Sequence, residues 1–310
     1  MPDETCPTPS LAGPPAPAAA AAERFSGLTL VATPIGNLGD LSPRALAALQ
    51  AAEVILCEDT RITARLCNTF RITAPLVTLH DHNEEQRTAE VLQWLQAGRN
   101  VALVSDAGTP LISDPGFRLL RAAVAAGAAV SAVPGPNAGL LALTLSGLPP
   151  QPYLFQGFLP PKAAARRAAL AKLVAAERAG LSATLVFYEA PHRLAETLSD
   201  LAMLLGPRPA AVARELSKRF EEVVRAPLDV LAARYAAAPP RGEITVVVGP
   251  AEAEAAPAPD IDSLLVAALA RGSLKQAVAE VTAATGQPRK IVYARALALA
   301  HGSRPPPAEG

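Results

Sequence analysis

The sequence lacks an excess of charge of either sign. Its 310 residues contain 28 Lys and Arg and 28 Asp and Glu, so the formal net charge at pH 7 is zero. Net charge therefore gives no argument for a nucleic-acid partner, and RNA would have to meet a local basic patch. Half of the residues are hydrophobic, and the length suits two or three domains with large cores.

Cysteine is scarce, with Cys6, Cys57 and Cys67 forming no CxxC pair. This pattern argues against a disulfide framework or a zinc site and fits a reducing compartment. No charge-free apolar run reaches the roughly 18 residues that span a bilayer. Residues 1–26 are rich in Pro and Ala but have no basic region followed by an apolar one, as a signal peptide would. We therefore expect a cytoplasmic protein with a disordered leader over 1–26.

Two common phosphate-binding motifs are also missing, since neither GxGxxG nor GK[ST] occurs. The chain instead alternates short apolar runs with helix-like segments such as 43–52, 84–97 and 117–126. The apolar runs occupy residues 28–33, 53–59, 75–81, 101–107 and 129–135. Such an alternation predicts a parallel sheet covered on both faces. Ser42 and Pro43 are typical of the start of a helix.

Prolines at 149–152 indicate a boundary, after which strands and helices alternate less regularly. Predicted strands at 153–159, 183–190, 210–216, 220–225 and 242–249, with helices at 162–178, 192–205 and 228–237, favour a mixed sheet. Residues 273–285 and 289–300 flank a Gly-Gln-Pro turn and predict a helix-turn-helix. The expected organisation is a leader (1–26), two α/β domains (27–148 and 149–250), a linker (251–259) and a small helical extension (260–303).

Unusual polar, Gly and Pro residues follow the strands of the first half, where ligands of open parallel sheets bind. The most informative segment is SDAGTP at 105–110, continued by SDPG at 113–116. Glycine allows close approach of the backbone, and Asp supplies acceptors for ribose or amine donors. The simpler alternative is a pair of turns in which Asp114 caps a helix ahead of Pro115, but two such turns at one strand end favour a binding site.

Ionisable groups follow two more strands, in Glu58-Asp59-Thr60-Arg61 and His80-Asp81-His82-Asn83-Glu84. These histidines and carboxylates raise a metal site as an alternative. We favour substrate contacts, or a polar network that positions them, and expect no metal. FYEAPHR at 187–193 and basic clusters at 162–167 and 289–295 are further candidates for substrate contact, although solvated helix faces would also explain the clusters.

Taken together, these motifs resemble the small-subunit ribosomal RNA methyltransferases of the tetrapyrrole-methylase superfamily. The likeness runs from about Leu28 to Gly249 and rests, in chain order, on VATPIGNLGDL, CEDTR, LHDHNE, VSDAGTPLISDPG, PGPNA, FLPPK, FYEAPHR, ARELSKRFEE and GEITVVV. The helical tail is similar to an extension of many members. The resemblance implies two α/β domains, S-adenosylmethionine in the cleft between them, and a homodimer. It also implies methylation of the ribose 2′-oxygen of a decoding-site cytidine in 16S rRNA, in naked RNA or in the small subunit.

The cofactor contacts that the resemblance implies fall on residues of both halves, and relatives often carry a small Ser or Cys in place of Asn137. They are Asp106, Ala107, Gly108, Thr109, Pro110, Asn137, Ala138, Tyr188, Glu189, Gly242 and Glu243. Candidate substrate contacts include the TPIGN loop, which would face the substrate side, and basic residues of the tail. They are Pro34, Gly36, Asn37, Arg61, His80, Asn83, His192, Arg193, Arg289, Lys290 and Arg295.

Methyl transfer to a ribose hydroxyl benefits from a base, or from a cation that favours the alkoxide. The candidates are Glu84, His82, Asp59 and Lys162, among which the sequence makes no choice. Three other functions stay open: a tetrapyrrole C-methyltransferase, a Mg²⁺-dependent nucleotide hydrolase and a non-catalytic RNA-binding protein. The absence of a phosphate-binding loop argues against the hydrolase.

Overall fold

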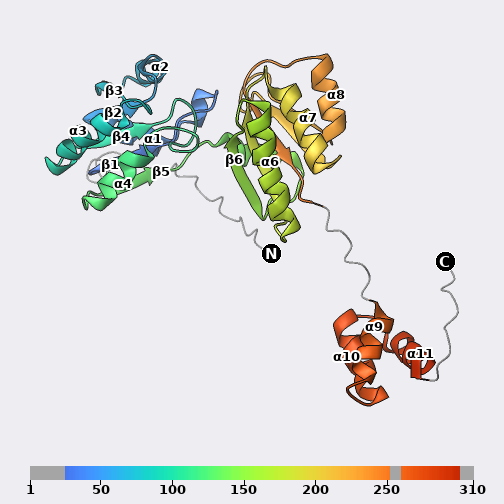
Figure 1. The fold of residues 1–310 in the computed structure, drawn as a ribbon. Coiled ribbons are helices and arrows are strands. Elements are labelled where there is room, and N and C mark those ends of the chain that lie inside the picture. Colours follow the sequence, from blue (N-terminus) through green and yellow to red (C-terminus); the bar gives the residue numbers. More distant parts are fainter. Residues whose placement is uncertain (1–24, 252–259, 301–310) are drawn as a thin grey trace, which may run out of the picture. The chain divides into compact units, whose positions relative to one another are not determined.

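The computed structural model describes residues 25–251 and 260–300, which form two compact units divided at Ala251 (Figure 1). Nearly all of the predicted leader and linker, and the last residues of the predicted tail, lie outside the described residues. No helix within the described ranges is both long enough and apolar enough to cross a membrane.

The first sheet is parallel throughout, with the strand order β3-β2-β4-β1-β5. Its strands are β1 (Leu28–Val31), β2 (Val54–Cys57), β3 (Leu76–Thr78), β4 (Val101–Val104) and β5 (Val130–Val133). The five predicted strands are therefore confirmed, although each is shorter than expected. The polar, Gly and Pro residues at their carboxyl ends leave the sheet and form loops.

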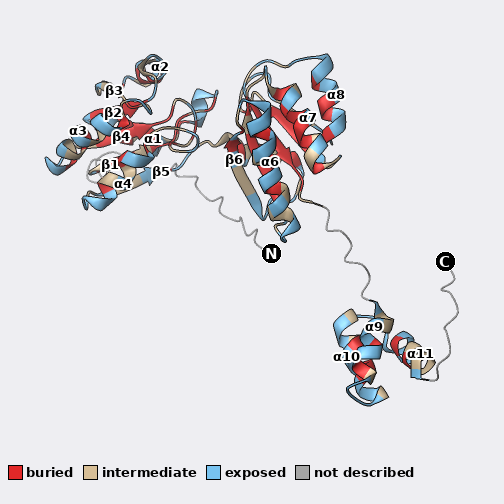
Figure 2. Ribbon diagram, in the orientation of Figure 1, coloured by how far each residue is buried: buried red, intermediate tan, exposed pale blue. Residues whose placement is uncertain are grey.

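Helices cover both faces of this sheet, as predicted. Ile55 and Cys57 pack with α1 (Pro43–Ala51) and α2 (Thr60–Phe70) on one face. Val54 and Leu56 pack with α3 (Glu84–Gln96) and α4 (Phe117–Ala125) on the other face. Figure 2 shows the buried residues between the sheet and its helices. Ser42 caps α1 by accepting a hydrogen bond from the Ala45 N–H, which confirms the predicted helix start.

The second sheet is mixed, as expected, with the order β6-β7-β10-β8-β9 and only the β6–β7 pair parallel. Its strands are β6 (Tyr153–Phe158), β7 (Thr184–Glu189), β8 (Pro209–Arg214), β9 (Glu222–Pro227) and β10 (Ile244–Val248). Helices α6 (Ala163–Arg178), α7 (Leu194–Leu205) and α8 (Leu228–Ala237) cover one face. The other face packs against α5 (Ala138–Ser146), which follows the last strand of the first sheet.

Two arginines of the predicted basic cluster at 162–167 are occupied within this half. Arg166 is only 2% exposed, and its Nε donates to Asp200 Oδ2 at 2.6 Å. Arg167 donates to the other oxygen of the same carboxylate at 2.7 Å. Because a buried ion pair is broken only at high cost, Arg166 is committed to joining α6 to α7. Arg167 shares the same carboxylate but is exposed, and Lys162 is the exposed cation of this cluster with no ion pair in the described part of the chain.

The second unit consists of α9 (Ile261–Leu269), α10 (Leu274–Thr285) and α11 (Arg289–Ala300) around a small core of Leu, Ala and Val. A reciprocal capping box between Ser273 and Gln276 starts α10, and Gly286 ends it in the left-handed conformation. The predicted helix-turn-helix is therefore present, with α9 packed against it.

Candidate functional site

Neighbouring strands β1 and β4 define the crevice of the first sheet. The helix after β1 lies on one face and the helix after β4 on the opposite face, so the two connections diverge and leave room beyond the strand ends. The loops that follow are tied together by Thr33 and Gly108, whose backbone groups exchange hydrogen bonds of 2.9 and 3.1 Å.

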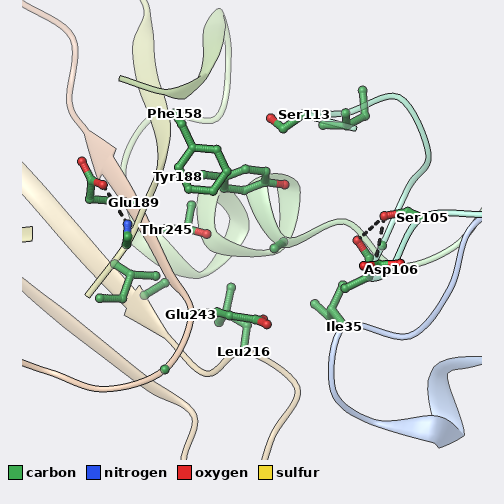
Figure 3. A pocket seen from close by; sticks show the side chains of 18 of the residues that line it. Ile35, Ser105, Asp106, Ser113, Phe158, Tyr188, Glu189, Leu216, Glu243 and Thr245 are labelled. Carbon is green, nitrogen blue, oxygen red and sulfur yellow. Dashed lines mark hydrogen bonds between the residues drawn. The ribbon is translucent and has the colours of Figure 1, made fainter. Parts of the chain in front are cut away.

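Internal hydrogen bonds fix the loop after β4. Ser105 Oγ donates to the Ala107 carbonyl and accepts from the Ala107 N–H (Figure 3). Thr109 Oγ1 donates to the Pro136 carbonyl. Asp106 Oδ1 accepts from the Asp59 N–H at 3.0 Å, which links this loop to the start of α2. Gly108 has φ +89°, a conformation that favours glycine. The loop is thus held in one shape before any ligand arrives.

A cavity of about 410 Å³ lies where the loops of the first sheet face the strand ends of the second. Its size suits one cofactor-sized molecule. From the first half it is lined by Ile35, Ser105, Asp106, Ala107, Gly108, Thr109, Ile112, Ser113, Asp114 and Ala138. From the second half it is lined by Phe158, Tyr188, Glu189, Ala190, Pro191, Ala213, Leu216, Gly242, Glu243, Ile244 and Thr245.

The wall of this cavity is acidic. Asp106, Asp114, Glu189 and Glu243 line it, and no Lys or Arg does so among the described residues. Burial raises the pKa of both aspartates, and repulsion from Asp106 adds to the shift at Asp114. Asp114 Oδ2 is buried and has no hydrogen-bond partner within the described part of the chain. A buried acceptor without a partner is costly, so this wall is suited to a ligand that carries positive charge and N–H donors.

The second half supplies a rigid opposite wall. Tyr188 Oη accepts from the Gly139 N–H at 3.2 Å, which connects β7 to α5, and burial raises the pKa of this phenol. Glu189 is buried, and its carboxylate accepts from Thr197 Oγ1 at 2.5 Å and from the Ala190 N–H at 2.7 Å. Because its acceptors are satisfied, Glu189 shapes the wall.

Glu243 is held at the edge of the cavity by an ion cluster. Lys218 Nζ lies 3.1 Å from Glu243 Oε2 and 2.9 Å from Glu215 Oε1, which also accepts from the Glu243 N–H. The stem of Lys218 packs over Gly36, where an added Cβ would come within 2.3 Å of it. The TPIGN loop of the first half therefore contacts the second half through a glycine that leaves room for this lysine.

Most of the residues predicted to contact the cofactor line this one cavity, and the exceptions are Pro110 and Asn137. Asn137 caps α5, with Oδ1 accepting from the Leu140 N–H at 3.0 Å, and lies on a neighbouring hollow. Its amide oxygen is thus engaged at the start of the helix and is not directed to the cavity that the other predicted residues line.

None of the four candidate bases lines the cavity. Glu84 is buried, and its Oε1 accepts from the Gly116 and Arg118 N–H groups at 3.1 and 2.9 Å at the start of α4. Asp59 caps α2 and pairs with Arg61, whose hydrogen bonds lower the pKa of Asp59 to about 2. His82 and Lys162 are exposed. Glu84 and Asp59 thus both accept hydrogen bonds at the starts of helices, a structural part that was not expected of them.

The candidate substrate residues also lie outside the cavity. Some of them hold local structure: Asn37 caps a short 3₁₀ helix (η2, Leu38–Asp40), and Asn83 accepts from the His80 N–H. Arg193 donates to the Leu159 carbonyl at 2.6 Å, and Arg295 forms a two-bond ion pair with Asp262 at 2.7 and 3.0 Å. The remaining candidates of this set are Pro34, Gly36, Arg61, His192, Arg289 and Lys290.

The histidine pair is not arranged as a metal site. The rings of His80 and His82 are 6.0 Å apart between centroids and meet edge to face. Within residues 25–251 and 260–300, no group of three or more His, Cys, Asp and Glu side chains is placed to hold a metal ion.

Several residues of the cavity were not predicted. Ile35, Phe158, Leu216 and Thr245 lie within quoted motifs but were not named as site residues, and the convergence of both sheets brings them together. Asp114 was noticed as part of the SDPG turn, but its helix-capping interpretation is wrong. The residue at the cap of α4 is Gly116, with φ +114°.

Comparison with known proteins places this geometry in a class. A family model for tetrapyrrole (corrin/porphyrin) methylases matches residues 27–232, and a model for the RsmI C-terminal HTH domain matches 255–300. The chain thus has the fold of an S-adenosylmethionine-dependent methyltransferase and belongs to that class, as expected. Over 274 residues the chain is 47% identical to ribosomal RNA small subunit methyltransferase I of Mesorhizobium japonicum, covering 88% of this chain and 92% of that protein. The protein of the same name from Xylella fastidiosa is 48% identical, with 86% and 97% covered. The chain belongs to the ribosomal RNA small subunit methyltransferase I family.

Solved structures agree on the fold. The chain superposes on the methyltransferase CobJ with a TM-score of 0.55 and 22% identity, covering 73% of this chain and 94% of that one. A diphthine synthase gives a TM-score of 0.56 at 16% identity, with 72% and 89% covered.

Proposed function

We propose that this chain transfers a methyl group from S-adenosylmethionine to the ribose 2′-oxygen of a decoding-site cytidine in 16S rRNA. The acidic one-ligand cavity of a methylase fold is the observation that carries the proposal. The rRNA substrate is supported by relatives named ribosomal RNA small subunit methyltransferase I that are 43–48% identical over most of the chain.

The residues present fit the cofactor. S-adenosylmethionine carries a sulfonium and an ammonium group, and the wall offers the carboxylates of Asp106 and Asp114, with no Lys or Arg among its described lining residues. Glu243, by contrast, is already paired with Lys218. The partnerless Oδ2 of Asp114 is an acceptor for an N–H donor. Buried Ile35, Leu216 and Ile244 provide apolar contacts for a planar ring. We assign binding to both walls, with Asp106 and Asp114 supplying the charge.

The bound cofactor supplies an already activated methyl group. The protein's contribution is therefore positioning of the two reactants and exclusion of water. The hydrogen-bonded loop at 105–109 and the Tyr188–Gly139 contact hold the two walls in place. None of the four candidate bases lines the cavity. The substrate would therefore have to meet a base at the mouth of the cavity, where Glu243 is exposed beside Lys218.

RNA contacts are proposed for exposed cations of the helical unit and of α2. Arg289 and Lys290 begin α11 and are exposed. Arg61 is also exposed, although it pairs with Asp59. In a chain of zero net charge, such local cations are what phosphates would meet.

We also propose that the protein acts in the cytoplasm as a homodimer. Phe117 and Val124 lie seven residues apart on α4, and each is 60% exposed. Apolar surface of this kind on one helix face is typical of a contact site.

The product tests the proposal. Small ribosomal subunits from a strain that lacks this methylation are incubated with methyl-labelled cofactor, and the RNA is digested to nucleosides. We expect label on 2′-O-methylcytidine and protection of one phosphodiester from alkaline cleavage, because the attacking hydroxyl is blocked. Label on a base, or on an added tetrapyrrole instead of RNA, contradicts the proposal. The Asp106→Ala protein, which we expect not to bind the cofactor, serves as the negative control.

A further inference from the structure

Phe158 presents an aromatic ring on the wall of the cavity. Phe158 is 55% exposed, whereas Ile35, Leu216 and Ile244 of the same wall are buried. An apolar ring left in water at a binding site loses the stabilisation that burial gives, so its position suggests a partner that covers it.

A β-bulge directs this ring to the cavity. The register of β6 against β7 shifts between Phe155 and Gly157. In a regular strand, residues three positions apart lie on opposite faces. Here the rings of Phe155 and Phe158 both contact Tyr188, with centroid distances to the Tyr188 ring of 4.9 and 5.6 Å. Figure 3 shows Phe158 beside Tyr188. Bulges next to active sites often redirect a side chain in this way.

The ring is also held firmly. Gly157 has φ +65°, and a Cβ at that position would lie 3.0 Å from Ser113 Oγ, on the loop that carries Asp114. Tyr188, on which Phe158 rests, is itself anchored by the Gly139 N–H. Because Tyr188 already supports one side of the Phe158 ring, the ring loses little side-chain entropy when a flat ligand covers its exposed side.

We propose that Phe158 stacks against the base of the nucleotide whose ribose enters the cavity. The inference rests on the proposed function, because it requires RNA at the mouth of the site. In a cavity sized for one ligand, a bound cofactor would take the enclosed part, which leaves the exposed ring for the substrate. Unpaired RNA bases stack on aromatic side chains, and any base provides the flat face that this requires.

The test compares substitutions at Phe158 by two separate measurements. We expect Phe158→Ala to raise KM for undermethylated small subunits by about 5- to 150-fold, which corresponds to one aromatic–base stack. Calorimetry should give an unchanged Kd for S-adenosylmethionine. Phe158→Tyr should retain activity, and Phe158→Leu should resemble alanine, because leucine keeps apolar volume but has no flat face. Phe220→Ala is the matched control, since Phe220 is 65% exposed and does not line the cavity.

Three results would overturn the proposal. A weakened Kd for the cofactor in Phe158→Ala would assign the ring to cofactor binding. An unchanged KM would remove it from the substrate site, and full rescue by leucine would reduce its role to apolar burial. If the unsubstituted protein transfers no methyl group to rRNA, the proposed function fails first, so the two failures are distinguishable.

Discussion

Asp114→Asn is the substitution that tests the acidic wall most directly. The carboxylate lines the cavity, and its Oδ2 atom is buried without a partner in the described residues. Burial and repulsion from Asp106 raise its pKa, so the free protein bears a cost for keeping this charge. A cationic ligand with N–H donors removes that cost by supplying the missing partner. Asparagine has nearly the same shape but no charge, and its amide can place a donor where an acceptor is needed.

The expected weakening follows from the type of contact. A hydrogen bond to a charged group contributes about 1.5–3 kcal/mol. This corresponds to a Kd for S-adenosylmethionine that rises by about 10- to 150-fold. Because the site is partly enclosed, screening by salt should change this value little.

Calorimetric titration of the purified proteins with S-adenosylmethionine measures the effect, and thermal unfolding without ligand verifies that the variant is folded. Asp81→Asn is the matched control. Asp81 also contributes to the acidic surroundings of Glu58, but it is exposed and does not line the cavity. Its Kd should therefore stay within about twofold of the parent. A folded Asp114→Asn protein with the parent's affinity would refute the assignment of this carboxylate to the cofactor.

Two further predictions concern charge. Because the pKa values of Asp106 and Asp114 are raised, protonation on acidification should weaken cofactor binding at a higher pH than the ordinary carboxyl value of about 3.9 would give. Calorimetry across this range should show a shallower pH dependence in Asp114→Asn, and a pH-independent affinity would contradict the role of the charges. In the helical unit, replacing Arg289 and Lys290 by Gln should lower the slope of log K for RNA against log salt by about 0.7–0.9 for each phosphate that the protein no longer neutralises. Replacing Arg295, which is already paired within the unit, should leave that slope unchanged.

The sequence predicted well that the loop at 105–110 lies at a cavity, because backbone chemistry defines its shape. Gly108 and its neighbours form turns whose residue types are specific to a conformation, and the strand before them fixes their place at the sheet edge. The apolar runs similarly predicted both sheets, since continuous Val, Leu and Ile are typical of strands buried on both faces.

Side-chain tasks were predicted less well because one residue type serves many contacts. Glu84 and Asp59 have the chemistry of a base, yet backbone N–H groups at helix starts engage both. Phe158 reaches the cavity only because a bulge changes the register of β6, and no local motif indicates that shift. Leu216 became part of the wall through the packing of distant segments, which periodicity does not encode.

The position of Glu84 has a consequence for how reduced activity in a variant is interpreted. One oxygen of this buried carboxylate ties the start of α4 to the start of α3 by accepting from Gly116, two residues beyond Asp114. The LHDHNE segment thereby holds in place the loop that carries Asp114. A shorter or neutral side chain at position 84 would loosen the loop that carries Asp114 and so weaken cofactor binding, although Glu84 itself contacts neither reactant. A glutamate that behaves in mutagenesis like the missing base would then be a remote support, and its signature would be a raised Kd with unaltered chemistry in the saturated enzyme.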